Sequence, residues 1–186
     1  MMKNEPLTPS PGVIFETERL IVRGFRPDDA KRLYEYHLDP IVKQWMPNEC
    51  YGNIAEAKDA ISFFSGHVQK RQLPYVLGVA SKLNGELIGD IGINEVDGEP
   101  GEVEIGFVIS ESARGKGYAT ELVTAMTAYV FKSFPVEVLQ GRVMHGNSAS
   151  VRVLEKTGFA FAKEEFGAED DPYGNGMLVY LLKKEK

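Results

Sequence analysis

Residues 102–130 change from a strand-like to a helix-like pattern across a short junction rich in glycine. Residues 102–109, EVEIGFVI, alternate in polarity, which predicts a strand with Val103, Ile105, Phe107 and Ile109 on one face and Glu104, Gly106 and Val108 on the other. Residues 119–130 place apolar side chains at helical spacing. A strand that leads so directly into a helix leaves the first helical N–H groups unpaired. The junction, residues 114–117 (RGKG), therefore predicts an anion site in a protein of strands and helices.

The rest of the chain alternates the same two patterns. Asn84-Gly85 stands between two apolar runs and predicts a tight hairpin, and Gly158 is typical of a helix C-terminal cap. Pro40 and Pro47 are expected to bracket an irregular piece. The expected helices are 28–37, 54–70, 118–130 and 147–157, and the expected strands are 19–25, 74–81, 86–96, 102–110, 136–144, 159–165 and 177–182.

Length and composition limit the class of protein. A chain of 186 residues with 43% hydrophobic residues has the size and apolar content of one globular domain, which we place at 16–184, after a flexible, proline-containing arm at 1–15. Twenty-one basic against 27 acidic residues argue against nucleic acid as the main partner. The absence of a long apolar run or a signal-peptide pattern argues against a membrane span and favours a cytoplasmic location.

Metal and disulfide chemistry find little support in the sequence. Cys50 is a lone cysteine, which excludes an intramolecular disulfide framework and a cysteine-based zinc site. The three histidines, His37, His67 and His145, lack metal-ligand spacing. We therefore expect a site that contains no metal.

The glycine junction is open to several readings. A dinucleotide fingerprint needs a third glycine where this chain has Thr120, and the spacing of a P-loop is absent. A simple turn without a ligand remains an alternative. The pattern that is present is Arg-x-x-Gly-x-Ala, from Arg114 to Ala119. Glycines let several backbone amides converge on one point, which suits a pyrophosphate, and Arg114 and Lys116 add positive charge.

Two separated segments resemble one known family. The segment EVEIGFVISESARGKGYATEL, followed by GNSASVRVLEKTGF, is similar to the GNAT superfamily of N-acetyltransferases, in the branch of the ribosomal-protein N-terminal acetyltransferases. The similarity covers about residues 16–182 and includes ETERLIVRGFRPDDA and WMP. The resemblance implies a single α/β (α+β) domain, with a mixed, mostly antiparallel, twisted sheet of about seven strands flanked by about four helices. It also implies acetyl-CoA as cosubstrate and a monomer or homodimer.

The resemblance also implies which residues bind the coenzyme. The pyrophosphate would accept hydrogen bonds from backbone amides at the junction, and the pantetheine would pair with the strand at Val108 and Ile109. The Val108 N–H would face the thioester carbonyl as an oxyanion donor, and Asn147 would contact the pantetheine. The implied junction residues are Arg114, Gly115, Lys116, Gly117, Ala119 and Thr120.

Two side chains are candidates for proton transfer. Glu104 is a carboxylate in the middle of an expected central strand, and the resemblance implies that it is the general base; a solvated edge or an ion pair is the alternative. Ser150 shares a helical face with Asn147 and would lie near the coenzyme sulfur, although Asn147 is also an ordinary N-cap. Many relatives carry a tyrosine acid four residues before the Gly-Phe pair, where this chain has Leu154.

Other residues carry weaker expectations. His145, at a strand end, is more typical of a surface residue than of a catalyst. Cys50, Trp45 and Met46 fall where the family builds its acceptor pocket, although packing is the commoner role. The acidic loop Glu169-Asp170-Asp171 would attract an amine if it faced that pocket.

The predicted function is acetyl-CoA-dependent transfer of an acetyl group to a primary amine, either a protein N-terminus or a small amine. A module that senses acyl-CoA without turnover is the alternative, and it would need neither Glu104 nor Ser150. A protein-interaction scaffold leaves the glycine junction unexplained. The resemblance implies that the acceptor contacts come from about residues 39–72 and from the last loop, which are variable, so the sequence does not identify the amine.

Overall fold

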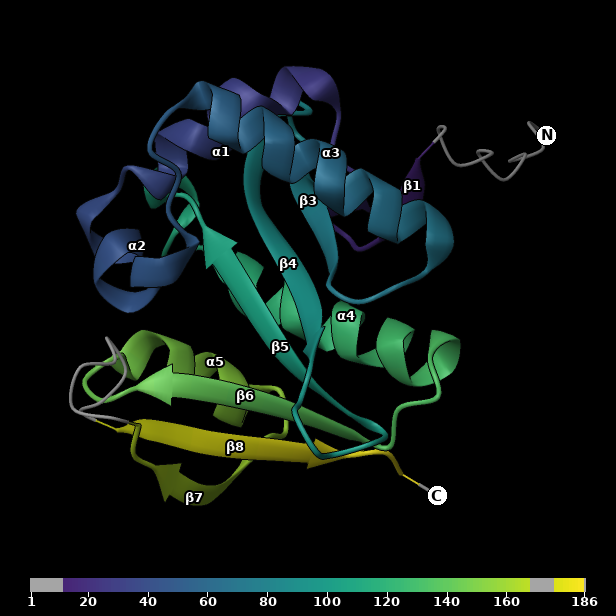
Figure 1. The fold of residues 1–186 in the computed structure, drawn as a ribbon, viewed down its shortest axis with the longest axis vertical. Helices are drawn as coiled ribbons and strands as arrows, with labels where there is room; N and C mark the ends of the chain where they lie inside the picture. Colours follow the sequence, from purple (N-terminus) through teal and green to yellow (C-terminus); the bar gives the residue numbers. More distant parts are fainter. Residues whose placement is uncertain (1–11, 168–175, 186) are drawn as a thin grey trace, which may run out of the picture.

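The computed structural model describes residues 12–167 and 176–185, and its described strands form one sheet (Figure 1). The strand order is β1-β2-β3-β4-β5-β6-β8-β7. Neighbouring strands are antiparallel except β5 and β6. The strands are β1 (Val13–Glu16), β2 (Leu20–Arg23), β3 (Tyr75–Ser81), β4 (Leu87–Glu95), β5 (Glu102–Ile109), β6 (Val138–Met144), β7 (Ala160–Glu165) and β8 (Met177–Lys183).

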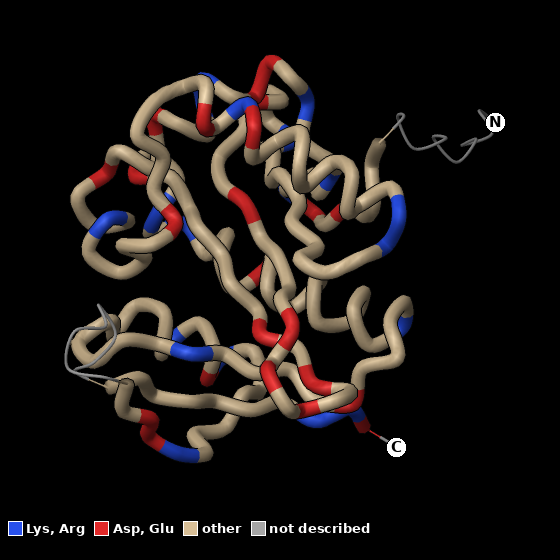
Figure 2. The backbone as a smooth tube through the Cα atoms, in the orientation of Figure 1, with Lys and Arg blue, Asp and Glu red and all other residues tan. Residues whose placement is uncertain are grey.

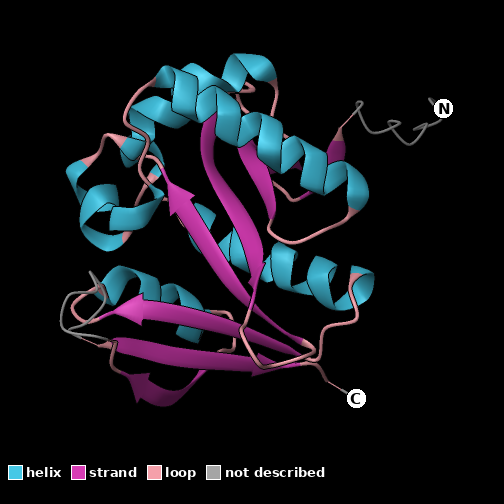
Figure 3. Cartoon of the chain, viewed as in Figure 1, coloured by secondary structure: helices cyan, strands magenta, loops and turns pink. Residues whose placement is uncertain are grey.

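Helices cover both faces of this sheet (Figure 3). They are α1 (Ala30–His37), α2 (Pro40–Trp45), α3 (Ile54–Lys70), α4 (Tyr118–Ser133) and α5 (Ser148–Lys156). In the part of the chain that the structure describes, no helix is both long enough and apolar enough to cross a membrane. The mixed sheet implied by the resemblance is thus present, with one strand and one α-helix more than expected among the described residues.

The two additional elements are a short strand, β1, and a helix that opens at a proline, α2. Val13–Glu16 pairs with β2, and Phe15 packs 5.2 Å from the ring of Tyr129, so residues 13–15 belong to the sheet and not to the expected arm. The rest of that arm, residues 1–11, lies outside the described residues. Pro40 does not border an irregular piece: it opens α2, where its fixed φ and missing N–H suit the first helical position.

β5 separates two cores, as its alternation predicts. Its odd-numbered residues, Val103, Ile105 and Ile109, join the core that includes Leu122 and Met126 of α4. Val108, on the other face, joins a second core with residues of α1 and α3. Figure 1 shows α4 behind the sheet and α1 and α3 in front of it.

β5 and β6 hold together at only one end. Their parallel ladder runs from the pair Glu102↔Val138 to the pair Glu104↔Gln140, and the strands then diverge toward their C-terminal ends (Figure 1). On either side of this gap the ladders are antiparallel and continue along the full strands. The sheet therefore opens as a wedge in its middle, next to the start of α4.

Gly89 allows β4 and β5 to approach closely beside this wedge. A Cβ atom on Gly89 would lie 2.1 Å from the Val108 carbonyl oxygen, so Gly89→Ala must push the two strands apart. We expect a loss of about 3 kcal/mol or more in the free energy of unfolding, measured by urea denaturation. Gly106→Ala on β5 is the matched control, because its Cβ meets nothing within 4 Å. Equal stability of the two variants would contradict the close approach.

Candidate active site

A cavity of about 460 Å³ occupies the wedge between β5 and β6. Its walls come from α2, the end of β5, the start of α4, β6 and α5. All of the site residues predicted from the sequence line it, except Lys116 and Glu104. The fold thus brings together the glycine junction and the segment around Asn147, which are about thirty residues apart in the chain.

Unpaired backbone N–H groups gather where α4 begins. Gly115 and Gly117 have φ angles of 74° and 79°, a conformation that glycine adopts without strain. Within the described residues, the N–H groups of residues 115–117 donate no backbone hydrogen bond, and the Glu121 N–H donates to the Gly117 carbonyl at 3.2 Å. The amides of residues 115–120, together with the positive end of the helix dipole, can therefore bind an anion.

The two cations of the junction both make contacts within the chain. Arg114 donates from Nε to the Ile109 carbonyl at 3.0 Å, and its Nη2 lies 2.7 Å from the Asp39 carboxylate at the start of α2. Lys116 donates from Nζ to the Ser112 carbonyl at 2.7 Å. The amides and the helix dipole are thus available to an anion here, and Arg114 also lines the cavity, whereas Lys116 does not. That the two side chains add charge for the anion stays a prediction.

The backbone of β5 shows which amides face the wedge. The Ser110 N–H donates to the Ile88 carbonyl of β4. In the regular antiparallel register that continues from there, the N–H groups of Val108 and Glu104 also point toward β4. The carbonyl of Ile109 accepts from Arg114 instead. The expectation for Val108 is therefore wrong in one respect: its N–H points toward β4, and the N–H of Ile109 points into the opening.

Glu104 lies on β5 at the last residue pair before the strands diverge. Its side chain is 30% exposed, and Arg142 of β6 lies 3.7 Å from its Oε2. The same arginine lies 3.2 Å from Glu165 of β7 and lines the cavity. Burial raises the pKa of Glu104 above that of an ordinary glutamate, and Arg142 opposes this rise. Glu104 can therefore be both the partner of Arg142 in an ion pair and a general base.

The comparisons with known proteins agree with this geometry. A family model described as the acetyltransferase (GNAT) domain matches residues 19–160. The chain belongs to the GNAT family of acetyltransferases. The uncharacterized N-acetyltransferase p20 of Bacillus licheniformis is 30% identical over 174 residues, which make up 91% of this chain and 96% of that protein.

A second relative and a solved structure extend the comparison. The [ribosomal protein uS5]-alanine N-acetyltransferase of Escherichia coli is 26% identical to this GNAT protein over 156 residues, covering 80% of this chain and 79% of that protein. The crystal structure of the microcin C7 self-immunity acetyltransferase MccE, in complex with acetyl-CoA and AMP, matches with a TM-score of 0.76 and 16% identity. That match covers 94% of this chain and 98% of MccE. At this identity the likeness establishes the fold alone.

On the α5 side of this GNAT cavity, Asn147 and Ser150 lie together. The Asn147 Oδ1 accepts from the Ser150 N–H at 3.2 Å, so Asn147 caps α5 while its amide nitrogen remains available to a ligand. Leu154, which stands where many GNAT relatives carry tyrosine, is buried. It packs so closely on Gly141 that a Cβ there would lie 2.7 Å from the leucine. His145 contacts Glu164 at the surface and does not line the cavity.

A cluster of polar side chains that the sequence did not reveal lies on the α1 side of the wedge. Tyr36 donates to Asp90 of β4 at 2.7 Å, and the Nε2 of His37 lies 3.4 Å from the same carboxylate. Glu49 reaches solvent, yet the surrounding chain desolvates its carboxyl and raises its pKa to about 7, with Asp90 adding to the rise. Figure 2 shows acidic residues along β4 and a basic residue across the opening on β6.

The residues expected on the acceptor side do not all lie at the cavity. Trp45 and Met46 line the cavity, whereas Cys50 is half-buried and does not. The acidic loop at 169–171 lies outside the described residues. A charged residue in the middle of β6 was the one sequence signal that could have drawn attention to Arg142; Tyr36, Glu49 and Asp90 come from separate elements and carry no shared pattern.

Proposed function

We propose that this GNAT enzyme transfers the acetyl group of acetyl-CoA to a primary amine by direct attack, with both substrates bound at once. The observation that carries the proposal is the set of unpaired amides at the start of α4, which border a cavity that ends in the wedge between β5 and β6. Acetyl-CoA offers a pyrophosphate for the amides and a narrow pantetheine for the wedge. MccE, which has the same fold, was solved with acetyl-CoA and AMP.

The residues of the wedge fit that ligand. Gly115 and Gly117 present amides without a Cβ in the way, and the open edge of β5 lets the pantetheine lie beside the strand. The amide nitrogen of Asn147 can donate to a pantetheine carbonyl. When bound, acetyl-CoA supplies an activated acetyl thioester.

Three groups of the chain then stabilise the developing charge, accept the amine proton and hydrogen-bond the leaving sulfur. The Ile109 N–H, directed into the opening, donates to the thioester carbonyl oxygen and stabilises the negative charge that develops there. Glu104, with its raised pKa, accepts the proton of the amine directly or through a water molecule. The Ser150 hydroxyl, which lines the cavity, hydrogen-bonds the departing sulfur.

A protein or peptide α-amine is the acceptor that these groups serve best. At neutral pH the loss of a proton costs an α-amino group about 1 kcal/mol, whereas it costs a lysine side chain about 5 kcal/mol. Glu104, tied to Arg142, is a modest base and suits the easier task. The Escherichia coli relative is, by its name, an N-acetyltransferase that acts on an alanine of ribosomal protein uS5.

A thiol-release assay with acetyl-CoA tests this function. The panel contains peptides with free N-termini, the same peptides with blocked N-termini, and small amines including polyamines. We expect release with free N-termini and none with blocked ones. Release with small amines alone would overturn the α-amine assignment. Tight acetyl-CoA binding with no release from any amine would favour the acyl-CoA-sensing module.

Arg142→Met tests the coupling between Arg142 and Glu104. Because Arg142 opposes the rise that burial imposes on the pKa of Glu104, its removal raises that pKa further. The acid limb of the pH profile of kcat/KM therefore moves to higher pH. Arg152→Met is the matched control, because Arg152 lines the same cavity but has no ion pair with Glu104 among the described residues. An acid limb that stays in place in Arg142→Met would contradict the coupling.

A further inference from the structure

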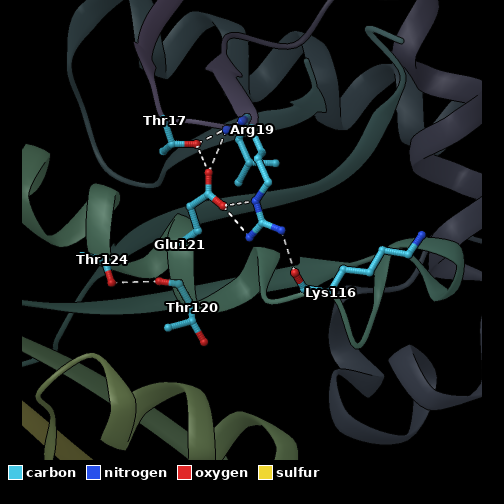
Figure 4. A network of polar contacts seen from close by, with 7 residues as sticks. Thr17, Arg19, Lys116, Thr120, Glu121 and Thr124 are labelled. Atoms are coloured by element: carbon cyan, nitrogen blue, oxygen red, sulfur yellow. Dashed lines mark hydrogen bonds and ion pairs between the residues drawn. The ribbon is translucent and has the colours of Figure 1, made fainter. Parts of the chain in front are cut away.

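Arg19, in the turn between β1 and β2, contacts the glycine junction (Figure 4) and does not line the cavity. Its Nε and Nη2 each lie 2.6 Å from the Glu121 carboxylate in the first turn of α4. Its Nη1 donates to the Lys116 carbonyl at 2.8 Å, and its guanidinium lies 4.6 Å from the centre of the Tyr118 ring. One side chain thus contacts three residues at or next to the junction.

Glu121 keeps this arginine in place. Its other oxygen accepts from the Thr17 hydroxyl and, at 2.9 Å, from the Arg19 backbone N–H. Burial by itself would raise the pKa of Glu121, but the hydrogen bonds from Thr17 and Arg19 outweigh it and lower the pKa. Glu121 is therefore ionised at neutral pH, and its charge-assisted hydrogen bonds fix the guanidinium in one orientation.

The bond from Arg19 to the Lys116 carbonyl determines where the next amide points. In a trans peptide the C=O and the N–H lie on opposite sides of the C–N bond. A guanidinium that holds the Lys116 carbonyl on the outside therefore turns the Gly117 N–H to the other side. Gly117 lines the cavity and the Lys116 side chain does not, which is consistent with this orientation.

We propose that Arg19 is a positioning residue for the coenzyme: by holding the Lys116 carbonyl, it keeps the Gly117 N–H directed at the pyrophosphate before the ligand arrives. Arg19 is unsuited to binding the phosphates itself, because Glu121, the Lys116 carbonyl and the Tyr118 ring occupy its guanidinium. The inference rests on the proposed function, since it assumes that acetyl-CoA binds at the junction.

Calorimetric titration of acetyl-CoA into Arg19→Ala tests the proposal. Loss of one well-oriented donor predicts an affinity about tenfold weaker. The KM for acetyl-CoA rises by a similar factor, while kcat at saturating acetyl-CoA stays close to that of the wild type. A merely structural role would lower kcat as well as the affinity for acetyl-CoA. Arg71→Ala is the matched control: Arg71 lies 5.8 Å over the Phe134 ring and donates to the Ser133 carbonyl at the opposite end of α4.

Arg19→Lys separates orientation from charge and guards against misfolding of the alanine variant. A lysine keeps a positive charge beside Glu121, but one ammonium cannot reach both the carboxylate and the Lys116 carbonyl in the geometry of a guanidinium. We expect the lysine variant to bind acetyl-CoA nearly as weakly as the alanine variant. Millimolar guanidinium should restore binding to Arg19→Ala, and urea at the same concentration should not.

The outcomes distinguish this inference from the proposed function. Wild-type affinity in Arg19→Ala, or full recovery in Arg19→Lys, overturns the positioning role, provided that Gly117→Glu, which places a negative charge among the junction amides, abolishes binding. Wild-type affinity in Gly117→Glu as well would mean that acetyl-CoA does not bind at the junction, and the proposed function itself would fail.

Discussion

Gly117→Glu is expected to abolish acetyl-CoA binding. Gly117 has a φ of 79°, and its N–H is one of the unpaired amides at the start of α4. A glutamate there brings a strained backbone and a negative charge into a group of donors whose partner is a pyrophosphate. We expect the affinity to fall more than about 100-fold, which corresponds to about 3 kcal/mol.

Calorimetry measures this effect, and Gly85→Glu is the matched control. Gly85 has a φ of 73° in the hairpin turn between β3 and β4, with nothing within 4 Å of an added Cβ. The control therefore carries the same backbone strain and the same added charge away from the junction. Equal affinities in the two variants would show that the amides after Arg114 do not hold the coenzyme.

Glu104→Gln is expected to lower kcat by about 100- to 1,000-fold, in the range attributed to general base catalysis. The amide is close in shape to the carboxylate but cannot accept the proton of the amine. Acetyl-CoA affinity should change little, because Glu104 does not line the coenzyme cavity. Glu102→Gln, two residues earlier on the same face of β5, is the control and should retain wild-type kcat.

The pH profile gives this prediction a second measurement. The base works only when deprotonated, so wild-type kcat/KM falls as the pH drops through the pKa of Glu104. Because burial raises that pKa, the fall begins at a higher pH than an ordinary glutamate would give. The part of the limb that Glu104 contributes should disappear in Glu104→Gln, which leaves only the titration of the acceptor amine. Retention of both the limb and the wild-type rate would exclude Glu104 as the base.

The local elements could largely be predicted from the sequence because their signals are local. Alternation in residues 102–109 reports which faces are buried, and Asn84-Gly85 occupies the turn between β3 and β4. Signals failed where one residue type has two meanings. Pro40 can border a loop or open a helix, and the four residues of β1 are too few for a pattern.

The candidate site was predictable in part. The junction residues other than Lys116, together with Asn147 and Ser150, line one cavity as expected. The direction of the Val108 N–H was wrong because it depends on the register between β4 and β5, which no local pattern encodes. The contacts of Arg19 and Arg142 join elements about a hundred and about forty residues apart.

The sequence by itself determined most of the elements, the faces they bury and the glycine junction, since each of these depends on neighbours along the chain. Only the tertiary structure decided that β5 and β6 separate after three residue pairs, that Arg142 pairs with Glu104, and that Arg19 holds the Lys116 carbonyl. The physical reason is that register and side-chain pairing depend on how separate elements pack against one another. That packing is a property of the whole core and not of any one segment.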